Sequence, residues 1–478
     1  MQGGADVTPP RSHLSANKGR VAVVRLGCGR NDVDADNIGG LLTADGFVMV
    51  EDPADADLVV VNTCTFIAPA RQESIEVVLD AADTARPVVV TGCMAERYGD
   101  ELAAAVPEAA AVVGFDQYPQ LADIVTTALG GGSGPGAPPV GTPALAAVGD
   151  GHSRPGLPLL GTGPAGPDAP PTASFPLRTV PKGPWAYLKI AGGCDRVCTF
   201  CSIPSFRGRF SSRTLPELEA EVRWLTSQGV VELVCVSENT TSWGKDLPGG
   251  RRSQADLIAM FDAVADLQMV RLMYLQPAEI TPVLLDAMAA SRAVVSYYDL
   301  SLQHASAPVL DRMARSGSPE RFLTLIEGIR RRDPAAVFRS SFITGFPGET
   351  DEDVATLIDF VDEAGLDWSG VFTFSPEDGT PAAVMPDQIP ADEARARAAA
   401  VTEVIEAVAL EKSQAFVGAT LQMLVEDHQD GYAVGRSYRE APETDGEIRA
   451  AGVGTPVGRF APVEINETDG VDLIGTGG

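Results

Sequence analysis

Apolar residues in the first part of the chain gather in short Val-rich runs that each end in a cysteine. The three clearest runs are VAVVRLGC, ADLVVVNTC and RPVVVTGC, which end at Cys28, Cys64 and Cys93. Continuous runs of this kind are typical of parallel strands buried on both faces. Stretches with helical periodicity, such as VDADNIGGLLTADG and APARQESIEVVLDAA, separate them. The pattern predicts a doubly wound α/β domain over residues 20–129.

Gly and Pro interrupt this alternation, supplying 22 of the 42 residues from Gly130 to Pro171. Such a composition cannot bury enough apolar surface to offset the entropy of the chain. We therefore predict a disordered linker over residues 130–178.

The strand–helix alternation resumes near Trp185 and continues through six apolar runs. These predicted strands are WAYLKIAGG, VVELVCVSEN, VRLMYLQP, YYDLSLQH, FRSSFITGF and WSGVFTFSPEDG. Amphipathic segments lie between them: LPELEAEVRWLTSQG, QADLIAMFDAVADL, TPVLLDAMAAS with APVLDRMARSG, and DEDVATLIDFVDEAG. Six βα units predict a full or partial barrel over residues 180–411, with functional groups at the carboxyl ends of the strands.

A long helix over roughly residues 391–416 leads into a last region of different pattern. From Gln414 onward, short runs of alternating polarity are broken by Gly, Asp and Asn. This alternation predicts a small β-barrel over residues 412–478.

The net charge of −29 changes what partners can be expected. It argues against a nonspecific nucleic-acid binder, whose affinity comes mostly from Lys and Arg. No apolar run reaches the roughly 18 residues of a membrane helix, and the first residues do not resemble a secretory signal. We expect a cytoplasmic protein.

Seven cysteines, an odd number, argue for metal or redox chemistry rather than a disulfide framework in such a protein. Cys235 lies within the apolar run VVELVCVS, where we expect it to be a buried strand residue. The other six fall into two sets of three.

The first set lies in GGCDRVCTFCSIP, where Cys194, Cys198 and Cys201 have the spacing C-x₃-C-x₂-C. Three thiolates can hold three irons of a [4Fe–4S] cluster and leave the fourth iron open. Structural zinc is the alternative, but a closed zinc site needs four ligands, and no His or further Cys is nearby in sequence.

The second set is Cys28, Cys64 and Cys93, each placed just after a predicted parallel strand. Parallel strands share one carboxyl edge, so these cysteines are expected to converge there. Three thiolates again predict a cluster with one open iron; three unrelated core cysteines are the alternative.

The first cysteine motif resembles that of the radical S-adenosylmethionine (SAM) superfamily, in which the motif follows the first barrel strand. The resemblance implies that Phe200 packs near the adenine of SAM. It also implies that an electron from the cluster cleaves SAM to a 5′-deoxyadenosyl radical, which abstracts a hydrogen atom.

Two three-cysteine sets, an α/β domain, a radical barrel and a TRAM-like final barrel together resemble the methylthiotransferases. The stretches FIAPARQESIE, CSIPSFRGRFSSR, VSENTTSWGKDL, DLSLQHAS and FSPEDGTPA resemble the RimO-like branch. This implies two [4Fe–4S] clusters, two SAM molecules, and methylthiolation of an aspartate β-carbon in small-subunit ribosomal protein twelve. A sulfur donor and an electron donor such as flavodoxin or ferredoxin are then expected partners.

Two alternatives remain at this point: a tRNA adenosine methylthiotransferase of the same architecture, and a non-catalytic iron–sulfur scaffold. The scaffold is disfavoured because both cysteine sets leave an iron open. From Gln414 to the end there are 11 Asp or Glu and 4 Lys or Arg, a net of −7. Such a region disfavours stable RNA binding and suits a basic ribosomal protein.

The same resemblance implies supporting residues in FITGFPGET, where Gly345 and Glu349 would contact the cofactor. A tight turn and a helix cap explain these two residues equally well. His304 ends a strand that faces the same cavity. Departures from the family pattern are Gly29-Arg30 in place of Pro-Lys, Gln276 in place of His, and Asn239 in place of Asp.

Overall fold

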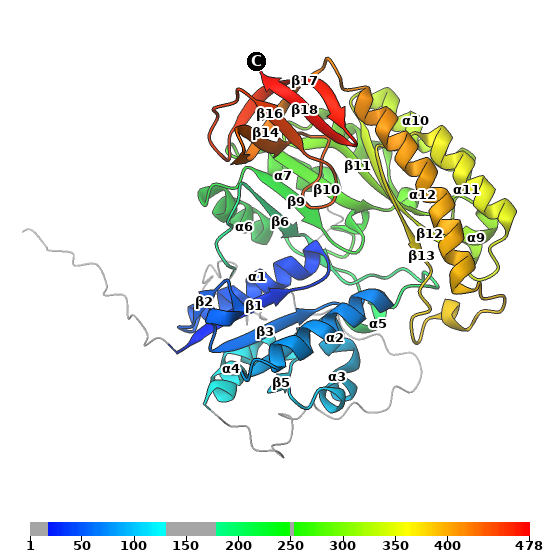
Figure 1. Cartoon of the computed structure of the whole chain (residues 1–478). Coiled ribbons are helices and arrows are strands. Elements are labelled where there is room, and N and C mark those ends of the chain that lie inside the picture. The colour runs from blue at the N-terminus through cyan, green and yellow to red at the C-terminus, as the bar shows by residue number, and fades with distance from the viewer. Residues whose placement is uncertain (1–17, 131–177, 249–252) are drawn as a thin grey trace, which may run out of the picture. The chain divides into compact units, whose positions relative to one another are not determined.

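The computed structural model describes residues 18–130, 178–248 and 253–478, which form two compact units. The N-terminal unit contains most of the described residues before 130, together with residues 178 and 179. The C-terminal unit contains the described residues from 180 to the end of the chain, together with residues 66–68 (Figure 1). Almost all of the linker predicted over residues 130–178 lies outside the described residues. None of the described helices is both long and apolar enough to cross a membrane.

The N-terminal unit is built on a five-stranded parallel sheet, and the three predicted Val-rich runs form three of its strands. Its strand order is β2-β1-β3-β4-β5. The strands are β1 (Arg20–Arg25), β2 (Val48–Val50), β3 (Leu58–Thr63), β4 (Val88–Gly92) and β5 (Ala111–Val112). The helices are α1 (Gly29–Ala44), α2 (Ala68–Ala82), α3 (Cys93–Ala105) and α4 (Leu121–Leu129). This is one of the two common doubly wound orders, with its switch point between β1 and β3.

The C-terminal unit begins with six parallel strands in the order β13-β12-β11-β10-β9-β6. They are β6 (Trp185–Lys189), β9 (Glu232–Val236), β10 (Met269–Leu275), β11 (Val294–Gln303), β12 (Val337–Thr344) and β13 (Trp368–Thr373). In the described part of the chain, β6 and β13 do not pair with each other, so the predicted barrel is a partial one. Cys235 lies in β9 and is fully buried, which confirms its prediction as a core residue.

Helices cover this sheet along its length. They are α5 (Ile203–Arg207), α6 (Leu215–Ser227), α7 (Gln254–Asp262), α8 (Pro282–Ala290), α9 (Ala307–Arg312), α10 (Pro319–Arg332), α11 (Asp351–Ala364) and α12 (Ala391–Gln414). Figure 1 shows α10, α11 and α12 side by side over one end of the sheet. The predicted helices leave out α10, although Ser318 caps its first turn and Pro319 occupies its first position.

A closed five-stranded barrel forms the end of the chain, which confirms the small β-barrel predicted there. Its order is β14-β15-β16-β18-β17. The strands are β14 (Thr420–Gln429), β15 (Tyr432–Arg436), β16 (Ile448–Ala451), β17 (Phe460–Asp469) and β18 (Asp472–Gly477). Alternate residues of β17 are buried, so the period of two in the sequence corresponds to the inside and outside of the barrel.

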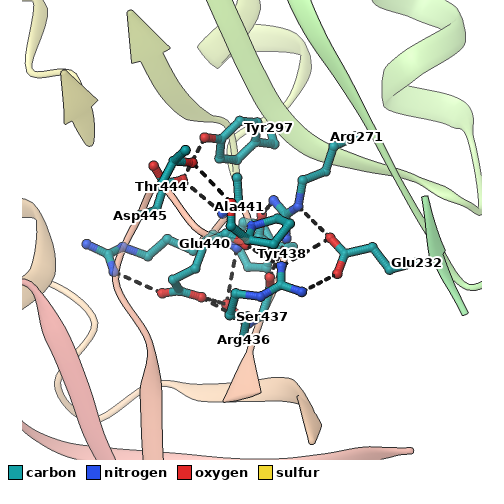
Figure 2. A network of polar contacts seen from close by, with 12 residues as sticks. Glu232, Arg271, Tyr297, Arg436, Ser437, Tyr438, Glu440, Ala441, Thr444 and Asp445 are labelled. Atoms are coloured by element: carbon teal, nitrogen blue, oxygen red, sulfur yellow. Dashed lines mark hydrogen bonds and ion pairs between the residues drawn. The ribbon is translucent and has the colours of Figure 1, made fainter. Parts of the chain in front are cut away.

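A buried ionic network joins this small barrel to the parallel sheet (Figure 2). Glu232 of β9 receives hydrogen bonds from Arg271 of β10 at 2.7 Å and from Arg436 of β15 at 2.7 Å. Arg271 also donates to the backbone carbonyls of Ser437 and Tyr438, both at 2.6 Å. The side chains of Glu232 and Arg271 are fully buried. The two arginines hold the pKa of Glu232 below its ordinary value, although burial acts to raise it.

We predict that Glu232→Gln lowers the free energy of unfolding by about 3–5 kcal/mol, because two buried guanidinium groups lose their shared carboxylate. A group whose folded pKa is lowered stabilises the protein above its ordinary pKa, here 4.5, and loses that effect as pH falls through the lowered value. The loss in Glu232→Gln should therefore be constant between pH 6 and 8 within about 0.5 kcal/mol.

Chemical denaturation of both proteins at these pH values measures the difference. Glu327→Gln is the matched control, since Glu327 forms an exposed pair with Arg331 on the surface of α10, and it should change stability by less than about 0.5 kcal/mol. Equal effects of the two substitutions would contradict the stabilising role of the network.

Candidate metal centres

Cys194, Cys198 and Cys201 lie on one loop at the carboxyl end of the first barrel strand. The loop lies between two short antiparallel strands, β7 (Ala191–Gly192) before it and β8 (Ser211–Ser212) after it. Gly193 has φ +75°, and a Cβ there would lie 2.2 Å from the carbonyl oxygen of Arg209. Glycine is therefore required in front of the first cysteine.

Backbone contacts hold the rest of this loop in place. The N–H of Cys194 donates to the carbonyl of Gly208 at 3.1 Å, and the N–H of Cys201 donates to the carbonyl of Cys198 at 3.2 Å. Thr199 bonds to the end of α9. Its N–H donates to the carbonyl of Met313 at 3.2 Å, and its hydroxyl donates to the carbonyl of Arg312 at 2.7 Å. The structure thus brings the three predicted ligands together on a fixed loop.

Burial raises the pKa of the Cys194 thiol to about 11, and the neighbouring Cys198 and Glu238 act in the same direction. At neutral pH this sulfur is therefore protonated in the protein alone. Metal ions bind thiolates, so binding at Cys194 must release its proton.

Arg315 lies against the same loop and was not singled out from the sequence. Its Nη1 is 3.6 Å from the Sγ of Cys198, and its Nη2 donates to the Oε1 of Gln276 at 2.5 Å and to the carbonyl of Ser301. Arg315 is 8% exposed. Because Cys198 and Arg315 are 117 residues apart, no local pattern in the sequence could relate them.

A cavity of about 470 Å³ opens beside the cysteine loop. Its lining includes Asp195, Arg196 and Val197 of the loop together with Asn239, Lys245 and Glu279. Glu279 accepts from Arg196 at 2.8 Å, from Asn239 at 2.9 Å and from Lys245. Burial opposes ionisation of Glu279, but bonds from Lys245, Ser242 and Asn239 outweigh it and lower its pKa to about 2. The ion pair between Arg196 and the ionised carboxylate of Glu279 therefore anchors the cysteine loop.

The remaining residues predicted to contact the cofactor lie in or near one buried turn. Phe200 packs edge-to-face on Phe346, with ring centroids 6.5 Å apart. Gly345 has φ +72°, and its N–H donates to Glu349 Oε1 at 2.9 Å. Glu349 also pairs with Arg397 at 3.1 Å, and its Oε2 lies 3.5 Å from the Nε2 of His304. The turn thus accounts for the internal contacts of Gly345 and Glu349, and their contact with a cofactor stays a prediction.

Cys28, Cys64 and Cys93 lie just beyond β1, β3 and β4 in the N-terminal unit. Cys28 is the N-cap of α1, and Cys93 is the first residue of α3. A Cβ on Gly27 would lie 2.9 Å from the Sγ of Cys64, which places the loop before Cys28 directly against Cys64. Thiolates near helix N-termini are stabilised by the helix dipole.

Asn31 connects the three strand ends. Its side-chain nitrogen donates to the carbonyls of Leu26 and Thr63, both at 2.9 Å, and its Oδ1 is 3.3 Å from the Sγ of Cys93. Its N–H donates to the carbonyl of Cys28 at 2.7 Å. The structure therefore brings all three cysteines to the switch point of the sheet, where doubly wound folds bind ligands. Asn31 was not singled out from the sequence. The signal that could have indicated it is the presence of an Asn close to two of the predicted ligands, three residues after Cys28 and two residues before Cys64.

Each centre offers three sulfur ligands, which suits an iron–sulfur cluster with one open iron. Within residues 18–130, 178–248 and 253–478, no three His, Cys, Asp or Glu side chains are arranged to hold a single metal ion. A four-iron cluster gives each sulfur its own iron, so its ligands stand farther apart than those of one ion. The residues at both centres fit the predicted clusters in type, and the clusters themselves stay predictions.

Three family models match the chain in consecutive regions. Residues 20–114 match the uncharacterized protein family UPF0004, residues 188–361 match the radical SAM superfamily, and residues 417–477 match the TRAM domain. The matches cover the N-terminal sheet, most of the parallel strands of the C-terminal unit, and the small barrel.

Full-length relatives are also found. The chain is 43% identical to the ribosomal protein uS12 methylthiotransferase RimO of Kineococcus radiotolerans, over 98% of both chains. It is 43% identical to the protein of the same name from Streptomyces avermitilis, covering 95% of this chain and 96% of that one. A solved structure of the radical SAM methyltransferase TsrM from Kitasatospora setae matches with a TM-score of 0.51 at 15% identity. It covers 88% of this chain and 77% of that one, and shows a shared fold.

The raised pKa of Cys194 predicts its reactivity in protein prepared without iron. Because the thiolate is the nucleophile, alkylation of Cys194 by iodoacetamide should accelerate about tenfold per pH unit from pH 7 to 9.5 without levelling off. Peptide mass spectrometry at timed intervals measures the rate for each cysteine, with fully buried Cys235 as the unreactive control. A plateau below pH 9 would contradict the buried, protonated thiol.

Proposed function

The chain belongs to the RimO family of ribosomal protein uS12 methylthiotransferases, and we propose that it inserts a methylthio group at the β-carbon of an aspartate in uS12. The observation that carries this proposal is 43% identity over 98% of the chain to a transferase of that name. Both cysteine sets are present and lie at the carboxyl ends of parallel strands, where the reaction needs its cofactors.

We assign the radical chemistry to the centre formed by Cys194, Cys198 and Cys201. A [4Fe–4S] cluster bound there supplies the electron that cleaves SAM, and one SAM molecule is used in this way. The cysteine loop, fixed by Thr199 and by the Arg196–Glu279 pair, holds the ligands in place. Phe200, Gly345 and Glu349 are proposed to contact SAM from the adjacent turn.

We assign sulfur delivery to the centre formed by Cys28, Cys64 and Cys93, which would hold the second [4Fe–4S] cluster. Asn31 orients this centre by bonding to the strand ends on both sides of the switch point. A second SAM molecule serves as the methyl donor. An electron donor such as flavodoxin or ferredoxin and a sulfur donor complete the reaction.

The surface of the final barrel supports a basic protein substrate over a nucleic acid. Of its four arginines, Arg436 and Arg439 are buried in ion pairs with Glu232 and Glu440. Two arginines are exposed, whereas six acidic residues are exposed: Asp427, Asp430, Glu443, Glu464, Glu467 and Asp469. The outer face is thus negative, which attracts a basic ribosomal protein and repels phosphates.

Mass spectrometry of ribosomal proteins and tRNA from cells lacking this gene tests the substrate. We expect uS12 to lose the mass of one methylthio group while tRNA modifications are unchanged. Restoring the gene should return the mark, and a gene encoding Cys194→Ala should not. Loss of a methylthio group from tRNA alone would overturn the choice of substrate and favour the tRNA branch.

Iron analysis tests the two-centre assignment. Anaerobically reconstituted protein should contain about eight irons per chain, and the Cys194→Ala/Cys198→Ala/Cys201→Ala variant about four. That variant should lose SAM cleavage because the remaining cluster lies in the other unit. The Cys28→Ala/Cys64→Ala/Cys93→Ala variant should also hold about four irons but keep SAM cleavage. Four or fewer irons in the unaltered protein would contradict the assignment.

A further inference from the structure

Arg315 is a buried cation whose charge is not balanced by a carboxylate. In the described part of the chain it forms no ion pair with Asp or Glu; its hydrogen bonds go to the amide oxygen of Gln276, the carbonyl of Ser301 and the sulfur of Cys198. Other strongly buried arginines in the described part of this unit have a carboxylate partner. Arg271, Arg436 and Arg439 are examples.

Burying a charge without a counter-charge costs several kcal/mol, so a purely structural role explains Arg315 poorly. The cysteine sulfurs are the groups nearby that can supply the missing negative charge, since they attract the guanidinium whenever they are ionised. Iron binds cysteine sulfurs as thiolates, so the compensation for Arg315 arises when the cluster is bound.

The direction of the guanidinium is set independently of the sulfur. Gln276 directly follows β10. Its own N–H donates to the hydroxyl of Thr241 at 3.1 Å, and its Oε1 accepts from Arg315 at 2.5 Å. Ser301, in β11, accepts from the same Nη2 atom. These two contacts leave Nη1 directed at Cys198 Sγ, 3.6 Å away.

We propose that Arg315 is a positioning residue that tunes the radical-generating cluster, donating a charge-assisted hydrogen bond to the Cys198 thiolate and raising the cluster's reduction potential. The inference rests on the proposed function, in which Cys194, Cys198 and Cys201 hold a [4Fe–4S] cluster. Reduction adds one electron to that cluster, and a fixed cation with a hydrogen bond to a ligand sulfur stabilises the extra negative charge. Arg315 thereby makes the cluster easier for its electron donor to reduce.

A potentiometric titration followed by electron paramagnetic resonance tests this role in the full-length chain. The Cys28→Ala/Cys64→Ala/Cys93→Ala variant is the parent, so that one cluster contributes to the signal. Dithionite is the reductant, and iron and sulfide contents establish that each protein is loaded. Arg315→Gln and Arg315→Lys are compared with Arg332→Gln, a control that removes an exposed arginine paired with Asp286 on the surface.

Arg315→Gln should lower the ratio of reduced to oxidised cluster at least tenfold at a fixed solution potential, equivalent to about 59 mV for a one-electron couple. Arg315→Lys keeps the charge but loses the planar fork, so it should restore part of that shift. Arg332→Gln should leave the potential of the parent unchanged.

The outcomes separate this inference from the proposed function. A parent without any cluster would overturn the ligand assignment, and the inference with it. A loaded parent whose potential is unchanged in both Arg315 variants would overturn the inference alone.

If Arg315→Gln fails to bind iron, the reduction potentials of Arg315→Lys and Gln276→Leu test the proposal instead. Gln276→Leu keeps the cation but removes the amide oxygen that directs it, so its potential should shift in the same direction as in Arg315→Lys. An unchanged potential in both would mean that Arg315 acts only on folding and would overturn the proposal.

Discussion

The shared carboxyl edge of parallel strands is the constraint on which the rest of this molecule depends. Each unit contains a parallel sheet, and in each the cysteines lie just beyond the strand ends. In the N-terminal unit the edge gathers three cysteines from separate parts of the chain at the switch point between β1 and β3. In the C-terminal unit a single loop after β6 and β7 carries all three. One geometric rule thus produces two centres from two different sequence patterns.

Polar contacts made at long range then fix these edges. Asn31 bonds across the strand ends of the N-terminal unit. In the C-terminal unit, Glu279 after β10 and Arg315 after α9 contact the cysteine loop. The same unit uses Glu232 with two arginines to attach the final barrel to the sheet (Figure 2). The exposed charged residues of the final barrel remain mostly acidic.

The sequence predicted the layers of the fold well because those layers follow from local patterns. Val-rich runs marked three of the five N-terminal strands, other apolar runs marked the six strands of the second sheet, and alternation marked the final barrel. The C-x₃-C-x₂-C spacing marked one candidate centre, and the position of three cysteines after predicted strands marked the other. The pattern left out α10, and it did not reveal Arg315, Asn31 or the network around Glu232. These polar residues are buried and find partners far away in the chain, as in the 117 residues between Cys198 and Arg315. A polar residue that is buried in this way cannot be distinguished from a solvated one by local periodicity.

We propose that two separate sets of three cysteines each hold a cluster with one iron left without a protein ligand. Anomalous X-ray scattering at the iron absorption edge, from crystals grown without oxygen, tests it most directly. We expect two four-iron clusters, one held by Cys28, Cys64 and Cys93 and the other by Cys194, Cys198 and Cys201. A single cluster, or a fourth protein ligand on either cluster, would contradict it.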